Sequence, residues 1–224
     1  MTYTGTMRSA FTLAHELGHG GHFFYANKEQ RLFDVRPSLY FVEAPSTMNE
    51  RLLAQKKKKK GADSKMKQWV IIQLLGTYYH NFVTHLLEAE FQRRIYNLAE
   101  QEVALTANML CNTKQTVLQE FWSDAVEISR ADGMTWMRQP HYYRGLYPYT
   151  YSAGLTASTA IAQQINEEGQ PAIDRWLKVL KAGGTLSPEE LMKLAGIDMT
   201  NPEPIRTAVA YVGSLIDELE RLYI

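Results

Sequence analysis

The stretch Thr12–Ala26, TLAHELGHGGHFFYA, places three of the six histidines of the chain and a glutamate within eight residues. His15 and His19 are four residues apart, so on a helix both side chains project from one face. Two imidazoles in this arrangement can bind a zinc ion, and Glu16 can reach a water at the same metal. The alternative is a helix with incidental histidines and a surface glutamate. The stretch therefore predicts a helix that either binds a metal or carries a chance polar cluster.

Three glycines interrupt the same predicted helix. Gly18, Gly20 and Gly21 each lower helix stability by about 1 kcal/mol relative to alanine. Glycines in a helix often mark places where something approaches the backbone closely. We therefore expect a close neighbour along this part of the helix.

A catalytic zinc needs a third protein ligand and an open position. Glu43, in the segment FVEAPSTMNE, lies 24 residues after His19 and is expected on a separate helix. Glu50 follows it seven residues later on the same helical face, where it could accept the second ring N–H of a ligand histidine. Without the histidine motif, both glutamates would be interpreted as ordinary surface residues.

The remaining histidines have weaker interpretations. His22 lies on nearly the same stripe as His15 and His19, but three ligands on one rigid helix cannot easily surround a metal, so we expect it behind the ligands or lining a cleft. His80 and His85 are five residues apart, which predicts different helix faces and roles in packing or at the surface.

A tyrosine-rich segment, HYYRGLYPYTYSAG, covers residues 141–154. Amphipathic rings often only fill space in a loop. Peptide hydrolysis, however, builds negative charge on the carbonyl oxygen, and neutral donors aimed at that oxygen lower the barrier. A histidine and a tyrosine hydroxyl from this segment are suitable donors.

Composition limits the partners and the compartment. The 224 residues have a formal net charge of zero, which gives no reason to expect nucleic acid or a membrane surface as a partner. Cys111 is the single cysteine, which excludes an intramolecular disulfide and fits a reducing compartment. We expect a cytoplasmic protein without a signal peptide or a membrane span. The lysine run Lys56–Lys60 is interpreted as a solvated helix end, with a nucleic-acid patch as the less favoured alternative.

Helical periodicity dominates the chain and predicts a mostly α fold, with residues 1–224 forming one multi-helical domain. The helix with the histidine motif is expected to pack against the helix with Glu43. Pro45 predicts a kink or a restart near Ser46 in the second helix, and TYTGT, residues 2–6, is the best strand candidate. The predicted helices are 6–27, 38–55, 65–101, 104–122, 155–167, 172–181, 188–195 and 202–222.

Four stretches together resemble the oligoendopeptidase F / thimet oligopeptidase family of zinc metallopeptidases. They are YTGTMRSAFTLAHELGHGGH, FVEAPSTMNE, QLLGTYYHNFVTHLLEAEFQ and RQPHYYRGLYPYTYSAG, in this order along the chain. The resemblance is to the C-terminal catalytic part of longer enzymes and is strongest toward the oligoendopeptidase F branch.

This resemblance implies a role for each motif residue. His15, His19 and Glu43 would bind one Zn²⁺, Glu16 would be the general base and Glu50 would orient a ligand histidine. His141 and Tyr149 would bind substrate and stabilise the transition state, with Tyr142 and Tyr143 as weaker substrate-binding assignments.

The expected function is a zinc-dependent endopeptidase domain that acts on short peptides. Its expected partners are the missing N-terminal part of the enzyme or a second copy of the chain. The alternatives are a non-catalytic zinc- or peptide-binding fragment, and an enzyme that hydrolyses a non-peptide substrate.

Overall fold

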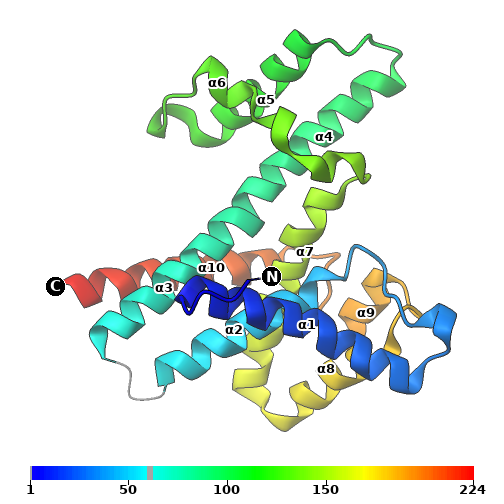
Figure 1. Cartoon of the computed structure of the whole chain (residues 1–224), viewed down its shortest axis with the longest axis vertical. Helices are drawn as coiled ribbons and strands as arrows, with labels where there is room; N and C mark the ends of the chain where they lie inside the picture. Colours follow the sequence, from blue (N-terminus) through cyan, green and yellow to red (C-terminus); the bar gives the residue numbers. More distant parts are fainter. Residues whose placement is uncertain (1, 60–62) are drawn as a thin grey trace.

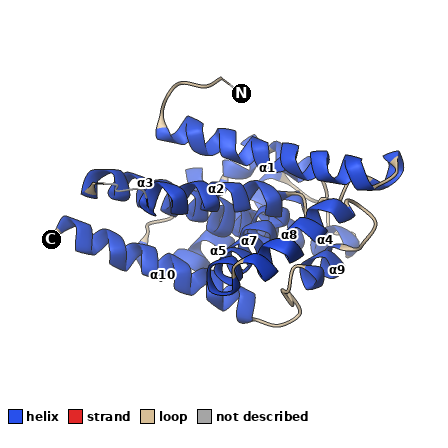
Figure 2. Ribbon diagram, turned by 90° about the horizontal axis from the view of Figure 1, so that it is seen from below, coloured by secondary structure: helices blue, strands red, loops and turns tan. Residues whose placement is uncertain are grey.

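The computed structural model describes residues 2–59 and 63–224, and every regular element in these ranges is helical (Figures 1 and 2). The mostly α prediction is confirmed, whereas TYTGT forms no strand. The α-helices are α1 (Met7–Glu29), α2 (Glu43–Lys59), α3 (Ser64–Tyr78), α4 (His85–Glu100), α5 (Ala107–Trp122), α6 (Arg130–Gly133), α7 (Tyr147–Glu168), α8 (Gln170–Ala182), α9 (Pro188–Leu194) and α10 (Glu203–Tyr223). Shorter 3₁₀ turns are Leu32–Asp34, Ser123–Ala125, Thr135–Arg138 and Pro140–Tyr143.

The helices form a packed base from which one arm projects (Figure 1). In the base, α1 lies against α2 and α8, and α2 packs on α7. Helix α4 and the start of α7 leave the base together and carry α5 and α6 at their far end. Two apolar clusters fill the base. One is centred on Phe41, Met48 and Trp176, and the other on Phe11 and Leu74.

Two helix starts differ from the sequence expectations. Helix α2 begins at Glu43, so Pro45 lies in its first turn. Backbone N–H groups in the first turn make no hydrogen bond within the helix, so a proline there does not interrupt it. Helix α7 begins at Tyr147 inside the tyrosine-rich segment, with Pro148 in its first turn. In contrast, α9 lies where the helix 188–195 was predicted, and Ser187 and Glu190 form a capping box at its start.

Close backbone contacts hold α1, α2 and α7 together. A Cβ added to Gly18 would lie 2.4 Å from the Pro45 carbonyl oxygen and 2.5 Å from the Ser46 Cα. A Cβ on Gly154 of α7 would lie 2.8 Å from the carbonyl carbon of Glu43. The expected close neighbour is therefore confirmed at Gly18, but the expectation is wrong at positions 20 and 21, where a Cβ would meet nothing within 4 Å.

The predicted long helix 65–101 contains a π-helical turn, Tyr79–Thr84, between α3 and α4. In a π turn the backbone hydrogen bonds join residues i and i+5, so side chains five residues apart lie on the same face of the helix. The rings of His80 and His85 accordingly lie 4.6 Å apart, although α-helical spacing had placed them on different faces.

Lys56–Lys59 form the last turn of α2, as expected for positive charge at a helix C-terminus. Lys60 lies outside the described residues. Lys58 pairs with Glu218 of α10. Within the described ranges, no helix is both long enough and apolar enough to cross a membrane. The assignment of residues 1–224 to a single domain stays a prediction.

The glycine contacts predict opposite effects for two substitutions in α1. Gly18→Ala should lower the free energy of unfolding by roughly 1–3 kcal/mol, because its methyl group overlaps the α2 backbone. The matched control Gly20→Ala should raise that free energy by up to about 1 kcal/mol, because the position is open and alanine favours the helix. Urea unfolding measures both. Equal effects of the two substitutions would contradict the close-contact account.

Candidate metal centre

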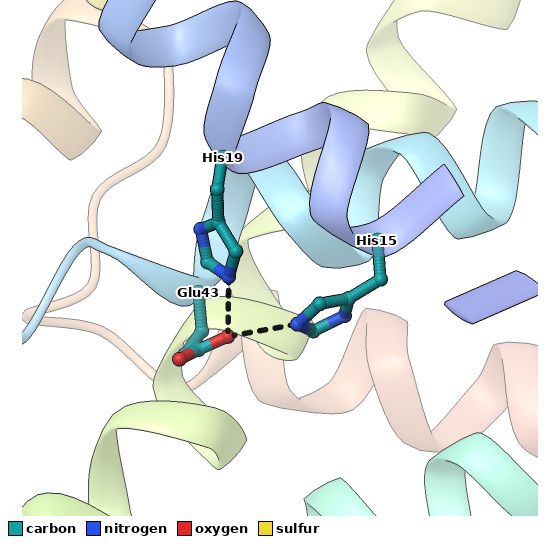
Figure 3. A group of neighbouring side chains, drawn as sticks. All are labelled: His15, His19 and Glu43. Carbon is teal, nitrogen blue, oxygen red and sulfur yellow. Dashed lines mark ion pairs between the residues drawn. The ribbon is translucent and has the colours of Figure 1, made fainter. Parts of the chain in front are cut away.

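Three side chains from two helices converge on one point (Figure 3). Nε2 of His15 and Nε2 of His19 lie 3.4 Å and 3.6 Å from the same oxygen, Oε2 of Glu43. The potential ligand atoms of all three residues lie within 4.8 Å of one another. The histidines occupy successive turns of α1, and Glu43 is the first residue of α2, directly beside the Gly18 contact. The structure thus brings together the three residues predicted as ligands.

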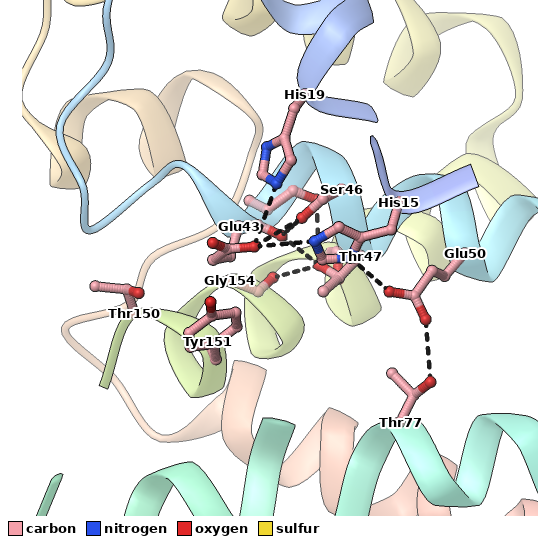
Figure 4. A network of polar contacts seen from close by, with 12 residues as sticks. His15, His19, Glu43, Ser46, Thr47, Glu50, Thr77, Thr150, Tyr151 and Gly154 are labelled. Carbon is pink, nitrogen blue, oxygen red and sulfur yellow. Dashed lines mark hydrogen bonds and ion pairs between the residues drawn. The ribbon is translucent and has the colours of Figure 1, made fainter. Parts of the chain in front are cut away.

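Glu50 lies behind His15, as the sequence predicted (Figure 4). Its Oε1 is 2.7 Å from Nδ1 of His15, and its Oε2 accepts a hydrogen bond of 3.0 Å from the hydroxyl of Thr77 on α3. With Nδ1 donating to Glu50, Nε2 is the ring nitrogen that faces Glu43. The hydroxyl of Thr77 on α3 holds the Glu50 carboxylate and so helps to orient the imidazole.

The Glu43 carboxylate is buried, with 3% of the residue exposed, and both of its oxygens have partners. Ser46 donates to Oε2 at 3.0 Å, and the hydroxyl of Tyr147 donates to Oε1 at 3.1 Å. Burial raises the pKa of Glu43, but hydrogen bonding and charge from His15 and His19 outweigh it and lower this pKa.

The two imidazoles respond to the same surroundings in opposite ways. For His15, burial lowers the pKa, but Glu43 and Glu50 outweigh it and raise the value to about 10. For His19, burial lowers the pKa, and the charge of His15 lowers it further. A proton on His15 therefore compensates the two carboxylates here, and a bound metal cation would supply positive charge at the same place.

Tyr147 and Tyr151 are the tyrosines of α7 that reach this centre. The hydroxyl of Tyr151 donates to that of Tyr147 at 3.2 Å, which extends the chain of hydrogen bonds from Glu43. Sequence reasoning missed both residues. The available signal was Pro148, which marks a helix start, together with the four-residue spacing that places the two rings on one helix face.

The other residues predicted from the tyrosine-rich segment lie in different places. The ring of His141 is 5.1 Å from that of Tyr147 and therefore borders the centre. Tyr149 is 43% exposed and packs against Tyr40. Tyr142 is turned toward Phe91, and its hydroxyl is buried without a partner. Tyr143 is 95% exposed.

Glu16 and His22 of α1 lie in different surroundings. Glu16 is exposed, and its charge acts on His19, one turn further along the helix. His22 is 1% exposed and packs edge-on against Phe41, and its Nε2 has no hydrogen-bond partner. Burial lowers the pKa of His22 to about 4, so this ring is a neutral core residue.

A second buried histidine–glutamate pair supports the tyrosines from the other side. The ring of His85 stacks on that of Tyr151 at 4.4 Å, and its Nδ1 lies 2.6 Å from Oε2 of Glu88. Gln139 donates to the other oxygen of Glu88 at 2.8 Å. The sequence predicted only packing or surface roles for His85. The π turn rotates His85 toward α7, and the His-x-x-Glu spacing on α4 was the available signal.

Comparison with known proteins places this chain in a family. Residues 1–211 match peptidase family M3. The chain is 33% identical over 222 residues to oligopeptidase PepF of Bacillus subtilis, and the match covers 99% of this chain and 33% of that protein. It is 24% identical to the oligoendopeptidase F homolog of Borreliella burgdorferi, covering 97% of this chain and 37% of that protein. The crystal structure of oligoendopeptidase-F from Enterococcus faecium superposes with a TM-score of 0.81 at 29% identity, over 95% of this chain and 39% of that one.

These matches define the class of protein: a helical peptidase domain. The chain belongs to peptidase family M3. It spans about a third of the length of the curated relatives it matches.

The Glu88 contacts predict a pH-dependent effect on stability. Burial raises the pKa of Glu88, but the hydrogen bonds from His85 and Gln139 outweigh it and hold this pKa below the ordinary 4.5. A lowered carboxylate pKa stabilises the folded state above about pH 4.5, and this contribution is lost as the pH falls through the folded pKa. Glu88→Gln should therefore destabilise the protein at pH 7 by roughly 1–3 kcal/mol.

The difference in unfolding free energy between wild type and Glu88→Gln should shrink between pH 5 and pH 3. Urea titrations at several pH values measure it. A constant difference across this range would show that charge on Glu88 does not carry the stabilisation.

Proposed function

We propose that this chain is the catalytic part of a zinc-dependent endopeptidase that hydrolyses peptide bonds in short oligopeptides. The observation that carries this proposal is the convergence of His15, His19 and Glu43, with Glu16 in the helical turn between the two histidines. Membership in peptidase family M3 and the names of the relatives, oligopeptidase and oligoendopeptidase F, support the same reaction.

The donor set fits zinc. Ligand atoms about 2.1 Å from a tetrahedral metal lie roughly 3.4 Å from one another, and the two nitrogen-to-oxygen distances are 3.4 Å and 3.6 Å. Two histidines and one carboxylate leave one position open, as catalytic zinc sites require. Zinc bound here would supply a Lewis acid and lower the pKa of water to about 7.

Different residues of the chain then transfer the protons, stabilise the developing charge and orient a ligand. Glu16 takes a proton from the attacking water and passes it to the leaving amine. Tyr147 and His141 donate to the carbonyl oxygen on which negative charge develops. For this, the single O–H of Tyr147 exchanges its bond to Glu43 for one to the substrate, while Tyr151 still donates to the Tyr147 oxygen. Glu50 keeps His15 in the orientation that directs Nε2 inward.

The proposal extends to substrate and partners through the relatives. Because the chain spans about a third of their length, the remaining length of a family enzyme would contribute the rest of the substrate-binding surface. Short peptides are the proposed substrates, and the missing part of the enzyme or a second copy is the proposed partner. The absence of nucleic-acid and membrane partners and the cytoplasmic location stay predictions.

Replacing Glu16 separates metal binding from turnover. Glu16→Gln should retain one zinc per chain, because Glu16 is not among the converging ligands, while kcat falls by about 10²–10⁴. Metal analysis and a quenched fluorescent peptide assay, each with and without chelator, measure the two properties. Undiminished turnover would refute Glu16 as the base.

The same assays test the alternatives. Zinc without turnover in the wild-type chain, alone and with the missing part supplied, would favour a non-catalytic binding fragment. Zinc with hydrolysis of esters or amides but not of peptides would favour a different substrate class.

A tyrosine pair on α7 tests which hydroxyl serves the reaction. Tyr147→Phe should lower kcat by about 10²–10³ through loss of a donor to the developing charge. Tyr149→Phe should have a much smaller effect, because its ring is partly exposed and packs against Tyr40 rather than against the centre. The kcat values of both variants, with bound zinc confirmed, decide the question. The reverse order would restore Tyr149 as the donor.

A further inference from the structure

A cavity of about 660 Å³ opens beside the candidate metal centre. Its wall contains His19, Glu43 and Tyr147, and also two arginine residues, Arg36 and Arg144. A molecule held by these arginines would therefore lie next to the proposed reaction site. Apolar wall residues between them are Phe23, Leu39 and Val42.

The charges in this wall are unbalanced. Glu43 is the one carboxylate among its lining residues, and it already interacts with the two ligand histidines, Ser46 and Tyr147. In the described ranges, the arginines that form ion pairs are Arg93, Arg94, Arg175 and Arg206. Two exposed arginines that form no ion pair in the described ranges thus border the cavity.

Both arginines start from well-held backbone positions. Arg144 follows the last 3₁₀ turn, where its N–H donates to the His141 carbonyl at 3.0 Å, and its guanidinium lies 5.4 Å from the centre of the Tyr147 ring. The backbone of Arg36 abuts Gly184, where an added Cβ would lie 2.1 Å from the Arg36 carbonyl oxygen. The backbone of each arginine is therefore held beside the cavity, Arg144 at the turn before α7 and Arg36 against the segment after α8.

We propose that Arg36 and Arg144 bind a carboxylate group of the peptide substrate, so that this cavity selects peptides with a negative charge close to the scissile bond. The proposal rests on the proposed peptidase function. The planar guanidinium fork matches the two oxygens of a carboxylate, and such charge-assisted hydrogen bonds are stronger than neutral ones. The apolar wall accommodates the hydrocarbon stem of the same residue or its neighbour. Both an acidic side chain and a free C-terminus present the required group.

A peptide series distinguishes these two sources. The parent is an uncharged, amidated peptide with a fluorescent label. One arm places a single glutamate, or a glutamine as its neutral match, at successive positions. The other arm replaces the terminal amide with a free carboxylate in peptides of successive lengths. Fluorescence anisotropy on chelator-treated protein gives Kd without turnover, and no carboxylate can then bind to a metal.

The charged member of at least one pair should bind about five- to tenfold more tightly than its neutral match, and the preference should disappear in Arg36→Gln and Arg144→Gln. Arg31→Gln is the matched control, because Arg31 is exposed on the same loop but outside the lining of this cavity. It should retain the preference. Thermal unfolding of each variant checks that the fold is intact.

Kinetics with zinc separate this proposal from the peptidase function. Tighter binding of the charged peptides without any turnover would contradict the peptidase function but would still support the carboxylate-binding site. Turnover without a preference in any pair, or a preference that persists in both cavity variants, would overturn the carboxylate site.

Discussion

Helices α1 and α2 approach each other closely because position 18 has no side chain, and this approach brings Nε2 of His15 and of His19 to one oxygen of Glu43. Gly154 allows α7 to approach the first turn of α2 from the other side in the same way. The two contacts enclose the carboxylate between three helix backbones. Protein interiors are close-packed, so a small change in helix separation would be felt at the ligand atoms. The geometry of the centre is therefore set by backbone packing before any metal binds.

The buried charges are tolerated because each has several partners. An unpaired buried carboxylate is costly, whereas Glu43 has histidine, serine and tyrosine partners, and Glu50 has His15 and Thr77. These partners come from α1, α2, α3 and α7, so the polar network also ties the helices of the base together (Figure 4). The proposed metal site and the stability of the base thus depend on the same interactions.

The sequence was sufficient where the chemistry depends on local spacing. The spacing of His15 and His19 on one helix, and the seven-residue offset of Glu50 from Glu43, follow from the period of an α-helix, and the structure places these side chains together. Sequence spacing did not identify the residues of the centre where their position depends on the residue at which a helix begins or on a π turn. Tyr149 was assigned from the family resemblance, and spacing did not single out Tyr147 because the segment was treated as a loop, whereas α7 starts at Tyr147. Arg36 and Arg144, over a hundred residues apart, meet at one cavity only through tertiary packing, which no local pattern encodes.

The wide turn Tyr79–Thr84 has a consequence for the residues on either side of it. A π turn holds about one more residue than an α turn, so the side chains beyond it point about 100° away from where an uninterrupted α-helix of the same sequence would place them. On the near side of this turn Thr77 meets Glu50, and on the far side His85 meets Tyr151. A continuous α-helix with this sequence could orient one of these pairs but not both. The extra residue in the wide turn lets a single long rod of helix serve both halves of the centre.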